Sequence, residues 1–95
     1  MKSQDKSATT HIRNLARIIC KLDSHQEVER FLLDLTTPAE LRALADRWRV
    51  ALMVEKEVPY REIAEKTGVS TATVTRVARC VSEGAGGYRA ALDKK

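Results

Sequence analysis

The sequence is poor in the residues that build many functional sites. Its 95 residues include two cysteines, two histidines and only four aromatic side chains. Cys20 and Cys80 form no C-x2-C pair, and the histidines form no H-x3-H pair, so the spacing does not support a zinc site. We therefore expect no bound metal, and we expect both cysteines to be reduced thiols in a cytoplasmic protein.

Long apolar runs are also missing. No stretch approaches the roughly 20 apolar residues that a membrane-spanning helix needs. His11, Arg13 and Arg17 interrupt the first twenty residues, so no secretory signal is expected. No Ser/His/Asp or Cys/His grouping stands out, and the "GAGG" at 84–87 lacks the preceding strand of a phosphate-binding loop. The sequence thus predicts no membrane partner, no catalytic residues and no enzyme.

Acidic residues are scarce in one part of a basic chain. The net charge is +4. Residues 1–57 carry ten Lys/Arg against nine Asp/Glu, a net of +1, and residues 58–95 carry seven against four, a net of +3. The segment 70–82 contains Arg76 and Arg79 and no acid. This pattern favours a polyanionic partner such as nucleic acid, and places the contact in that segment.

Apolar residues recur at helical spacing along most of the chain, which predicts an all-α protein. We expect a disordered tail over 1–8 and a single domain over 9–95. Ser24 with Glu27, and Thr37 with Glu40, are capping-box pairs that begin helices. The expected helices cover about 9–22, 25–35, 38–55, 60–67, 71–83 and 88–92. The expected inner side of the third helix is Leu41, Leu44, Ala45, Trp48, Ala51 and Leu52.

The first two expected helices are short and strongly apolar. Ile18, Ile19, Leu32, Leu33 and Leu35 lie close together in the sequence. Short helices are marginal without tertiary packing, so we expect this half of the chain to share its core with a second copy in a homodimer. The alternative is a self-contained bundle.

The stretch "GVSTATVTRVARC", residues 68–80, has two interpretations. Alternation from Thr71 to Thr75 is typical of a strand, whereas Val74, Val77 and Val81 repeat as in a helix. A small Ala64, then Gly68 four residues later, favours a helix-turn-helix over 59–82. An ordinary corner between two helices is the alternative, but it leaves the absence of acids unexplained.

Projection at 100° per residue gives the last long helix three sides. Val74, Val77 and Val81 form the core side. Ala72, Thr75 and Arg79 form an outward side suited to DNA, and Arg61 and Arg79 suit phosphate contacts. Thr73, Arg76 and Cys80 form a third flank, where a ligand could sit.

Two segments, "LTTPAELRALADRWRVA" and "YREIAEKTGVSTATVTR", resemble the Trp repressor superfamily over roughly residues 32–81, and "GAGGYRAAL" resembles its YerC/YecD branch. The resemblance implies a six-helix, intertwined homodimer that binds a palindromic operator in double-stranded DNA. It implies a transcriptional regulator, expected to be a repressor, associated with the nucleoid. The candidate DNA contacts are Arg61, Ser70, Thr71, Ala72, Thr73, Thr75, Arg76 and Arg79.

The resemblance also implies a small-molecule co-repressor site. Arg47 and Arg76 match two arginines that enclose an indole ring in tryptophan-binding members, and Thr37 matches a threonine near the ligand carboxylate. Val77 replaces a glycine there and Cys80 replaces a serine, which argues against tryptophan. Candidate ligand residues are Thr37, Arg47, Arg76 and Cys80, with the effector left open. A helical protein-interaction module without specific DNA binding is the alternative function.

Overall fold

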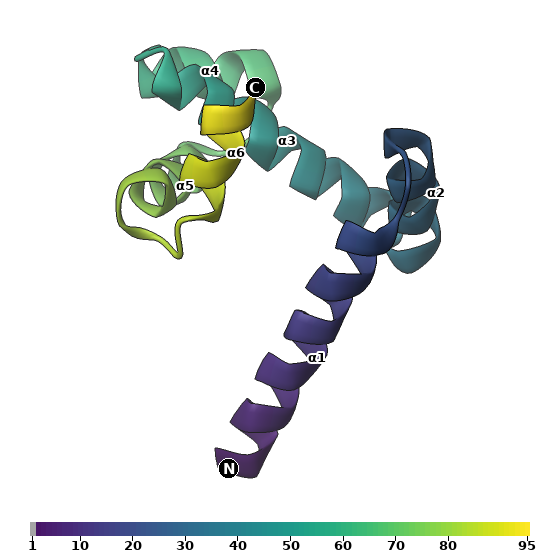
Figure 1. The fold of residues 1–95 in the computed structure, drawn as a ribbon. Helices are drawn as coiled ribbons and strands as arrows, with labels where there is room; N and C mark the ends of the chain where they lie inside the picture. The colour runs from purple at the N-terminus through teal and green to yellow at the C-terminus, as the bar shows by residue number, and fades with distance from the viewer. Residues whose placement is uncertain (1) are drawn as a thin grey trace. The chain divides into compact units, whose positions relative to one another are not determined.

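The computed structural model describes residues 2–95, with side chains from Ser7 onward. Over these residues the chain forms six α-helices and no strand (Figure 1). The all-α fold is confirmed, and the strand interpretation of 71–75 is wrong. The helices are α1 (Lys2–Lys21), α2 (His25–Leu35), α3 (Pro38–Glu55), α4 (Tyr60–Thr67), α5 (Thr71–Glu83) and α6 (Gly87–Lys94).

The chain divides into two compact units, of which the first ends at Thr37 and the second is Pro38–Lys95. The sequence led us to expect one domain over 9–95, preceded by a disordered tail over 1–8. In the structure residues 2–8 belong to α1, while Met1 lies outside the described residues. Residues 2–8 contain no Pro or Gly, so nothing in this segment terminates the helix.

The first unit contains α1 and α2, and its described side chains enclose no core. The Oγ of Ser24 accepts the N–H of Glu27 at 3.2 Å and so caps α2. The Glu27 carboxylate accepts the N–H of Asp23 at 2.8 Å, one residue before the capping-box partner that we expected. Between Ser7 and Thr37 no side chain is buried. Apolar side chains such as Ile12 and Leu33 remain 67% and 56% exposed.

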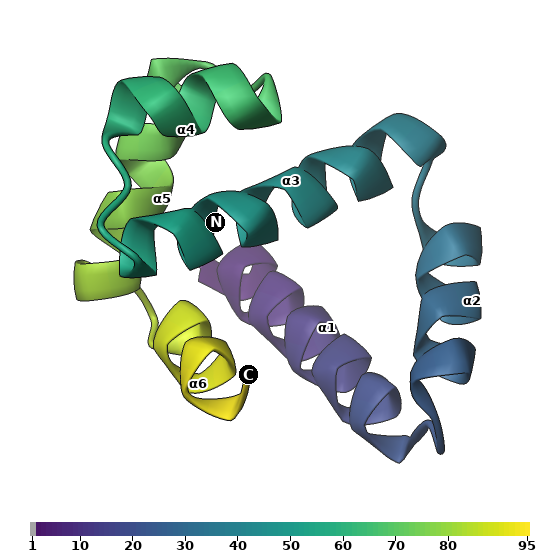
Figure 2. The same ribbon diagram turned by 90° about the horizontal axis from the view of Figure 1, so that it is seen from above.

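The second unit has a core where α3, α4 and α5 meet (Figure 2). Its side chains are Val50, Ala51, Ile63, Val74 and Val77, each at most 2% exposed. The expected inner side of α3 is correct at Ala51 but wrong at Leu44, which is 46% exposed, and at Ala45. The buried residues of α3 are Val50 and Ala51, which both lie in its C-terminal half. The expected inner side did not include Val50.

Two glycines set the chain direction in this unit. Gly68 has φ +81°, and its N–H donates to Ala64 O at 2.9 Å, which ends α4. Gly86 has φ +93° and precedes α6. Arg89 then joins α6 to α3 through Glu55 at 2.6 Å, and Leu92 is 4% exposed. The last short helix is therefore anchored by one ion pair and one buried apolar side chain.

Candidate nucleic-acid interface

The helices α4 and α5 are joined by the tight turn 68–70. Ser70 begins α5, because its Oγ accepts the N–H of Thr73 at 3.1 Å and donates to Thr73 Oγ1 at 3.0 Å. Val74 and Val77 then point into the core and hold α5 against α3 and α4. This packing leaves the other sides of α5 outside the core.

The candidate DNA contacts lie mainly on the surface of this second unit. On α5 the side chains of Thr71, Ala72, Thr75, Arg76 and Arg79 are exposed. Ser70 at the cap and Arg61 in the first turn of α4 are also exposed, whereas Thr73 is half-buried. The residues predicted from the sequence thus share the surface of α4, the turn and α5. Their contact with DNA stays a prediction.

The two arginines of α5 are unpaired, as are Arg42, Arg47 and Arg61, whereas two other arginines of the same unit have partners. Arg49 pairs with Asp46 at 3.2 Å, and Arg89 pairs with Glu55 and Asp93. Arg76 and Arg79 make no ion pair or hydrogen bond within the described chain. Unpaired guanidinium groups in a helical segment without acidic residues attract phosphates.

Two hydroxyl groups of this surface already have intramolecular partners. Thr75 Oγ1 donates to the carbonyl of Thr71 at 3.0 Å, so its methyl group is the part more suited to a base contact. The Ser70 hydroxyl both donates and accepts a hydrogen bond within the cap. Ser70 therefore shapes the start of α5, and a direct contact from its side chain would compete with that cap.

The third flank of α5 borders a hollow of about 190 Å³. It is lined by Arg47, Thr73, Arg76, Val77, Cys80 and Tyr88. Three of the four candidate ligand residues therefore lie together, and Thr37, which belongs to the first unit, is not among the lining residues. Val77 is 2% exposed, so most of its side chain packs into the core. The sequence analysis did not predict Tyr88 at this site. The signal that could have indicated it is that Tyr88 is one of only four aromatic residues and directly follows a glycine pair.

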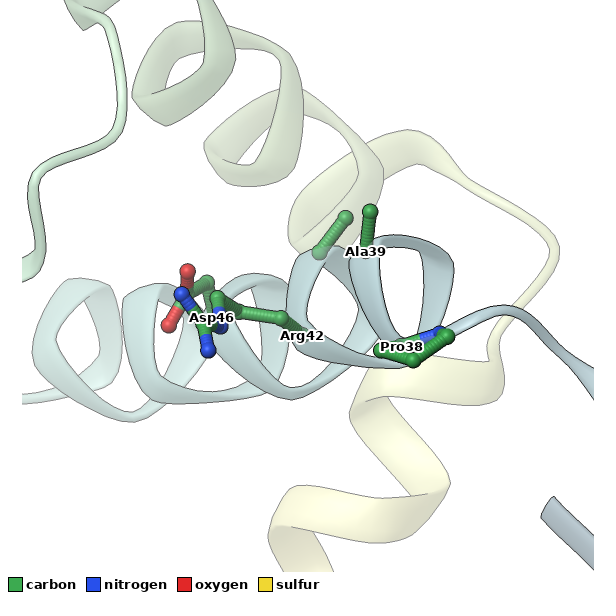
Figure 3. Close-up of a pocket in the computed structure, with 5 residues that line it drawn as sticks. Pro38, Ala39, Arg42 and Asp46 are labelled. Atoms are coloured by element: carbon green, nitrogen blue, oxygen red, sulfur yellow. The ribbon is translucent and has the colours of Figure 1, made fainter. Parts of the chain in front are cut away.

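Two other hollows lie in the second unit. One, of about 460 Å³, is almost entirely apolar and is lined by Trp48, Cys80, Ala85, Gly87, Tyr88 and Ala91. The other, of about 420 Å³, runs along the start of α3 (Figure 3). Its lining residues all come from one helix, and the carboxylate of Asp46 is already bound by Arg49. Neither hollow brings polar groups from several helices to one point.

Over residues 7–95, whose side chains are described, no group of three or more His, Cys, Asp or Glu could hold a metal ion. Cys20 and Cys80 are both free thiols. None of the described helices combines the length and the apolar character that a membrane crossing requires.

Comparison with known proteins places this geometry in a family. The sequence model for the Trp repressor protein matches residues 10–95. The uncharacterized protein YerC of Bacillus subtilis (strain 168) is 39% identical over 90 residues, which cover 95% of this chain and 86% of that protein. The Trp operon repressor homolog of Xylella fastidiosa (strain M23) is 35% identical over 63 residues, which cover 65% and 68%. The crystal structure of a TrpR like protein from Eubacterium eligens gives a TM-score of 0.83 at 36% identity, covering 95% of this chain and 93% of that one. The chain therefore belongs to the Trp repressor family.

Proposed function

We propose that the protein is a dimeric, sequence-specific DNA-binding regulator of transcription. In this proposal α4 and α5 form a helix-turn-helix, and α5 enters the major groove of the DNA. The observation that carries the proposal is the exposed surface of α5. It bears small side chains and two unpaired arginines, in a segment that contains no acidic residue. Repression is the proposed sign of regulation, because the Xylella relatives are named Trp operon repressor homologs.

The contacts follow from the chemistry of each side chain. The free N–H groups and the dipole at the start of α5 attract a backbone phosphate. Thr71, Ala72 and Thr75 are small enough to let the helix backbone approach the base edges, and a threonine methyl can touch a thymine methyl. Arg61 and Arg79 are the proposed contacts to phosphates, and such contacts set the register of a protein on the duplex.

The proposed dimer rests on the first unit. Five large apolar side chains there are at least 36% exposed: Ile12, Leu15, Ile18, Leu33 and Leu35. A soluble monomer rarely exposes so many large apolar side chains on two neighbouring helices of the chain, and a second copy would cover them. In the dimer we expect residues 9–95 to form one domain. A two-fold dimer would present two copies of α5 and so would select a palindromic operator.

The DNA-binding proposal is tested by selecting genomic fragments at two salt concentrations, followed by affinity measurements on the selected site. Thr75→Glu and Arg79→Glu should each weaken binding at least tenfold, because each adds negative charge to the DNA-facing surface. Arg79→Glu should also reduce the slope of log affinity against log salt by about 1.

Arg42→Glu on α3 is the matched control, since it makes the same charge change at another exposed arginine. It should leave the affinity close to that of the unmodified protein. A protein that selects no preferred palindrome and shows no salt dependence would refute the proposal. Retained partner binding in such a protein would point to the interaction module.

A further inference from the structure

We propose that the basic side of α1 makes a second contact with DNA, in which it binds backbone phosphates whatever the base sequence. The proposal rests on the proposed function in one respect, namely that DNA is the partner. The contact itself rests on the charge, exposure and spacing of side chains along α1, which belongs to the unit that carries none of the candidate base contacts.

The first observation is that charge is segregated within the first unit. Residues 6–22 carry four Lys/Arg and no Asp/Glu, whereas residues 23–37 carry one Lys/Arg against four Asp/Glu. The two longest stretches of the chain without an acidic residue are 6–22 and 66–82, and each is 17 residues long. The second stretch contains most of α5, the helix proposed to enter the major groove. The first lies almost entirely in α1 and is the more basic of the two.

The second observation is that three cations of α1 share one side of the helix. At about 100° per residue, Arg13, Arg17 and Lys21 fall within about 80° of one another. All three side chains are exposed. The large apolar side chains lie on the opposite side, roughly 140–260° round the helix from Arg13, and they are Ile12, Leu15, Ile18 and Ile19. A second copy that covers the apolar side therefore leaves the basic side open.

The third observation is that this charge has no partner. None of the three cations has an ion pair or hydrogen bond within the described residues. No acidic residue stands three or four positions away from any of them, whereas Lys66 of α4 pairs with Glu62 at 2.9 Å one turn away. Like charges four residues apart repel each other and weaken a helix. The row of cations therefore opposes the stability of α1, and an external anion would relieve the repulsion.

The spacing of the cations suits a row of phosphates. A rise of 1.5 Å per residue separates the positions of Arg13 and Lys21 by about 12 Å along the helix axis. Phosphates of one DNA strand follow one another about every 3.4 Å along the duplex axis, so each cation can neutralise a different phosphate. Such contacts add affinity without reading the base sequence.

An anionic membrane is the other polyanion that a basic amphipathic helix can meet. Helices that lie on a membrane surface typically carry Trp or Phe on the apolar side. The helix α1 contains no Trp, Tyr or Phe, and its apolar side is the one assigned to the dimer. These two features favour DNA as the partner of the basic side.

DNA titrations with a neutralised basic side test the contact. The variant Arg13→Gln/Arg17→Gln/Lys21→Gln removes three charges and keeps side chains that favour a helix. It should bind the selected site and an unrelated duplex about tenfold or more weakly at about 0.1 M salt. The slope of log affinity against log salt should fall by about 2 to 3 for each α1 that contacts the duplex. The ratio of the two affinities should stay unchanged, because phosphate contacts carry no sequence information.

The matched control removes the same charge from other places. Arg30→Gln/Arg42→Gln/Lys56→Gln also replaces two arginines and one lysine, all exposed and without an ion pair in the described chain. It should keep the salt slope of the unmodified protein. Arg13→Lys/Arg17→Lys keeps the charge on α1 and should also keep the slope, because a lysine contacts a phosphate as a point charge.

Three results would overturn the inference. Equal slopes in the α1 variant and the control would show that net charge acts without regard to position. An α1 variant that sediments as a monomer would assign the basic side to the dimer contact. Unchanged DNA binding, together with lost binding to vesicles that contain phosphatidylserine, would assign it to a membrane surface.

Failure of the proposed function gives a different result. A protein that selects no palindrome, but loses salt slope on any duplex when α1 is neutralised, would refute sequence-specific binding and leave the α1 contact standing. A protein that selects a palindrome with the same slope in both variants would refute the α1 contact alone.

Discussion

The two units of the chain use the same local signals and reach different degrees of burial. Ser24 caps α2 and Ser70 caps α5 with the same hydrogen bond to the third residue. Yet no described side chain of the first unit is buried, whereas the second unit encloses Val50, Ile63 and Val74 completely. Capping and periodicity therefore make helices in both units, but only the meeting of three helices makes a core.

The comparison suggests a division of roles. The unit Pro38–Lys95 carries the proposed DNA surface on helices that are already fixed by their own core. The unit that ends at Thr37 carries apolar side chains that lack a cover. We infer that the first unit forms the dimer interface and that the second unit contacts the base edges of the DNA.

The largest expected effect is a cavity in the core of the second unit. Ile63→Ala should lower the free energy of unfolding by about 2–5 kcal/mol, because the side chain is fully buried. Ile12→Ala, at a site 67% exposed in the single chain, is the matched variant. Urea unfolding at several protein concentrations separates them. The loss from Ile63→Ala should persist at every concentration, whereas any loss from Ile12→Ala should depend on association.

The next effect concerns the apolar surface of the first unit. Leu33→Glu should weaken the dimer by about 2 kcal/mol or more, because it places a charge in the proposed interface. Sedimentation should then detect a species near the chain mass of 10.6 kDa instead of twice that mass. Tyr60→Glu, at an exposed aromatic of the second unit, should leave the dimer intact. Unmodified protein that sediments as a monomer would contradict the proposed division of roles.

A smaller effect is expected at the turn before α5. Gly68 has φ +81°, so Gly68→Ala should cost about 1–2 kcal/mol of stability even though nothing lies within 4 Å of the added carbon. Gly87, inside the first turn of α6, also has open space and no positive φ. Gly87→Ala should be neutral or stabilising by up to about 1 kcal/mol. Equal losses in chemical denaturation would show that backbone conformation is not the cause.

The smallest effect is a pH dependence of the contact between α3 and α6. The hydrogen bond from Arg89 lowers the pKa of Glu55 below its usual value of 4.5. Because the pKa is lower in the folded state, the carboxylate stabilises the fold above about pH 4.5, and this contribution is lost as pH falls through the folded pKa. Glu55→Gln should remove this part of the acid dependence of Tm. Glu65→Gln, at an exposed glutamate with no ion pair in the described chain, should keep it.

Local rules predicted much of the fold. The ends of α3, α4 and α5, the Ser24 and Ser70 caps, and the turn at Gly68 agree with the structure, because each depends on residues within one helical turn. The prediction of which α3 residues are buried was wrong at several positions. Leu44 and Ala45 follow the apolar period but lie outside the core, while Val50 was overlooked. The spacing of apolar residues indicates which side of a helix is apolar, whereas the packing of neighbouring helices determines which part of that side is buried.

Side-chain chemistry at short range specifies the six helices, the Ser24 and Ser70 caps, the basic segment without acids and the buried side of α5, so these features could be predicted from the sequence. The family resemblance had already assigned Arg47 and Arg76 to one site, but tertiary packing is what brings Tyr88, from a third helix, to the border of the same small hollow. Arg47 and Arg76 are separated by 29 residues in the sequence, and no local rule specifies how helices so far apart will pack. Their meeting depends on the core formed by Val50, Ile63 and Val74, which fixes α5 against α3.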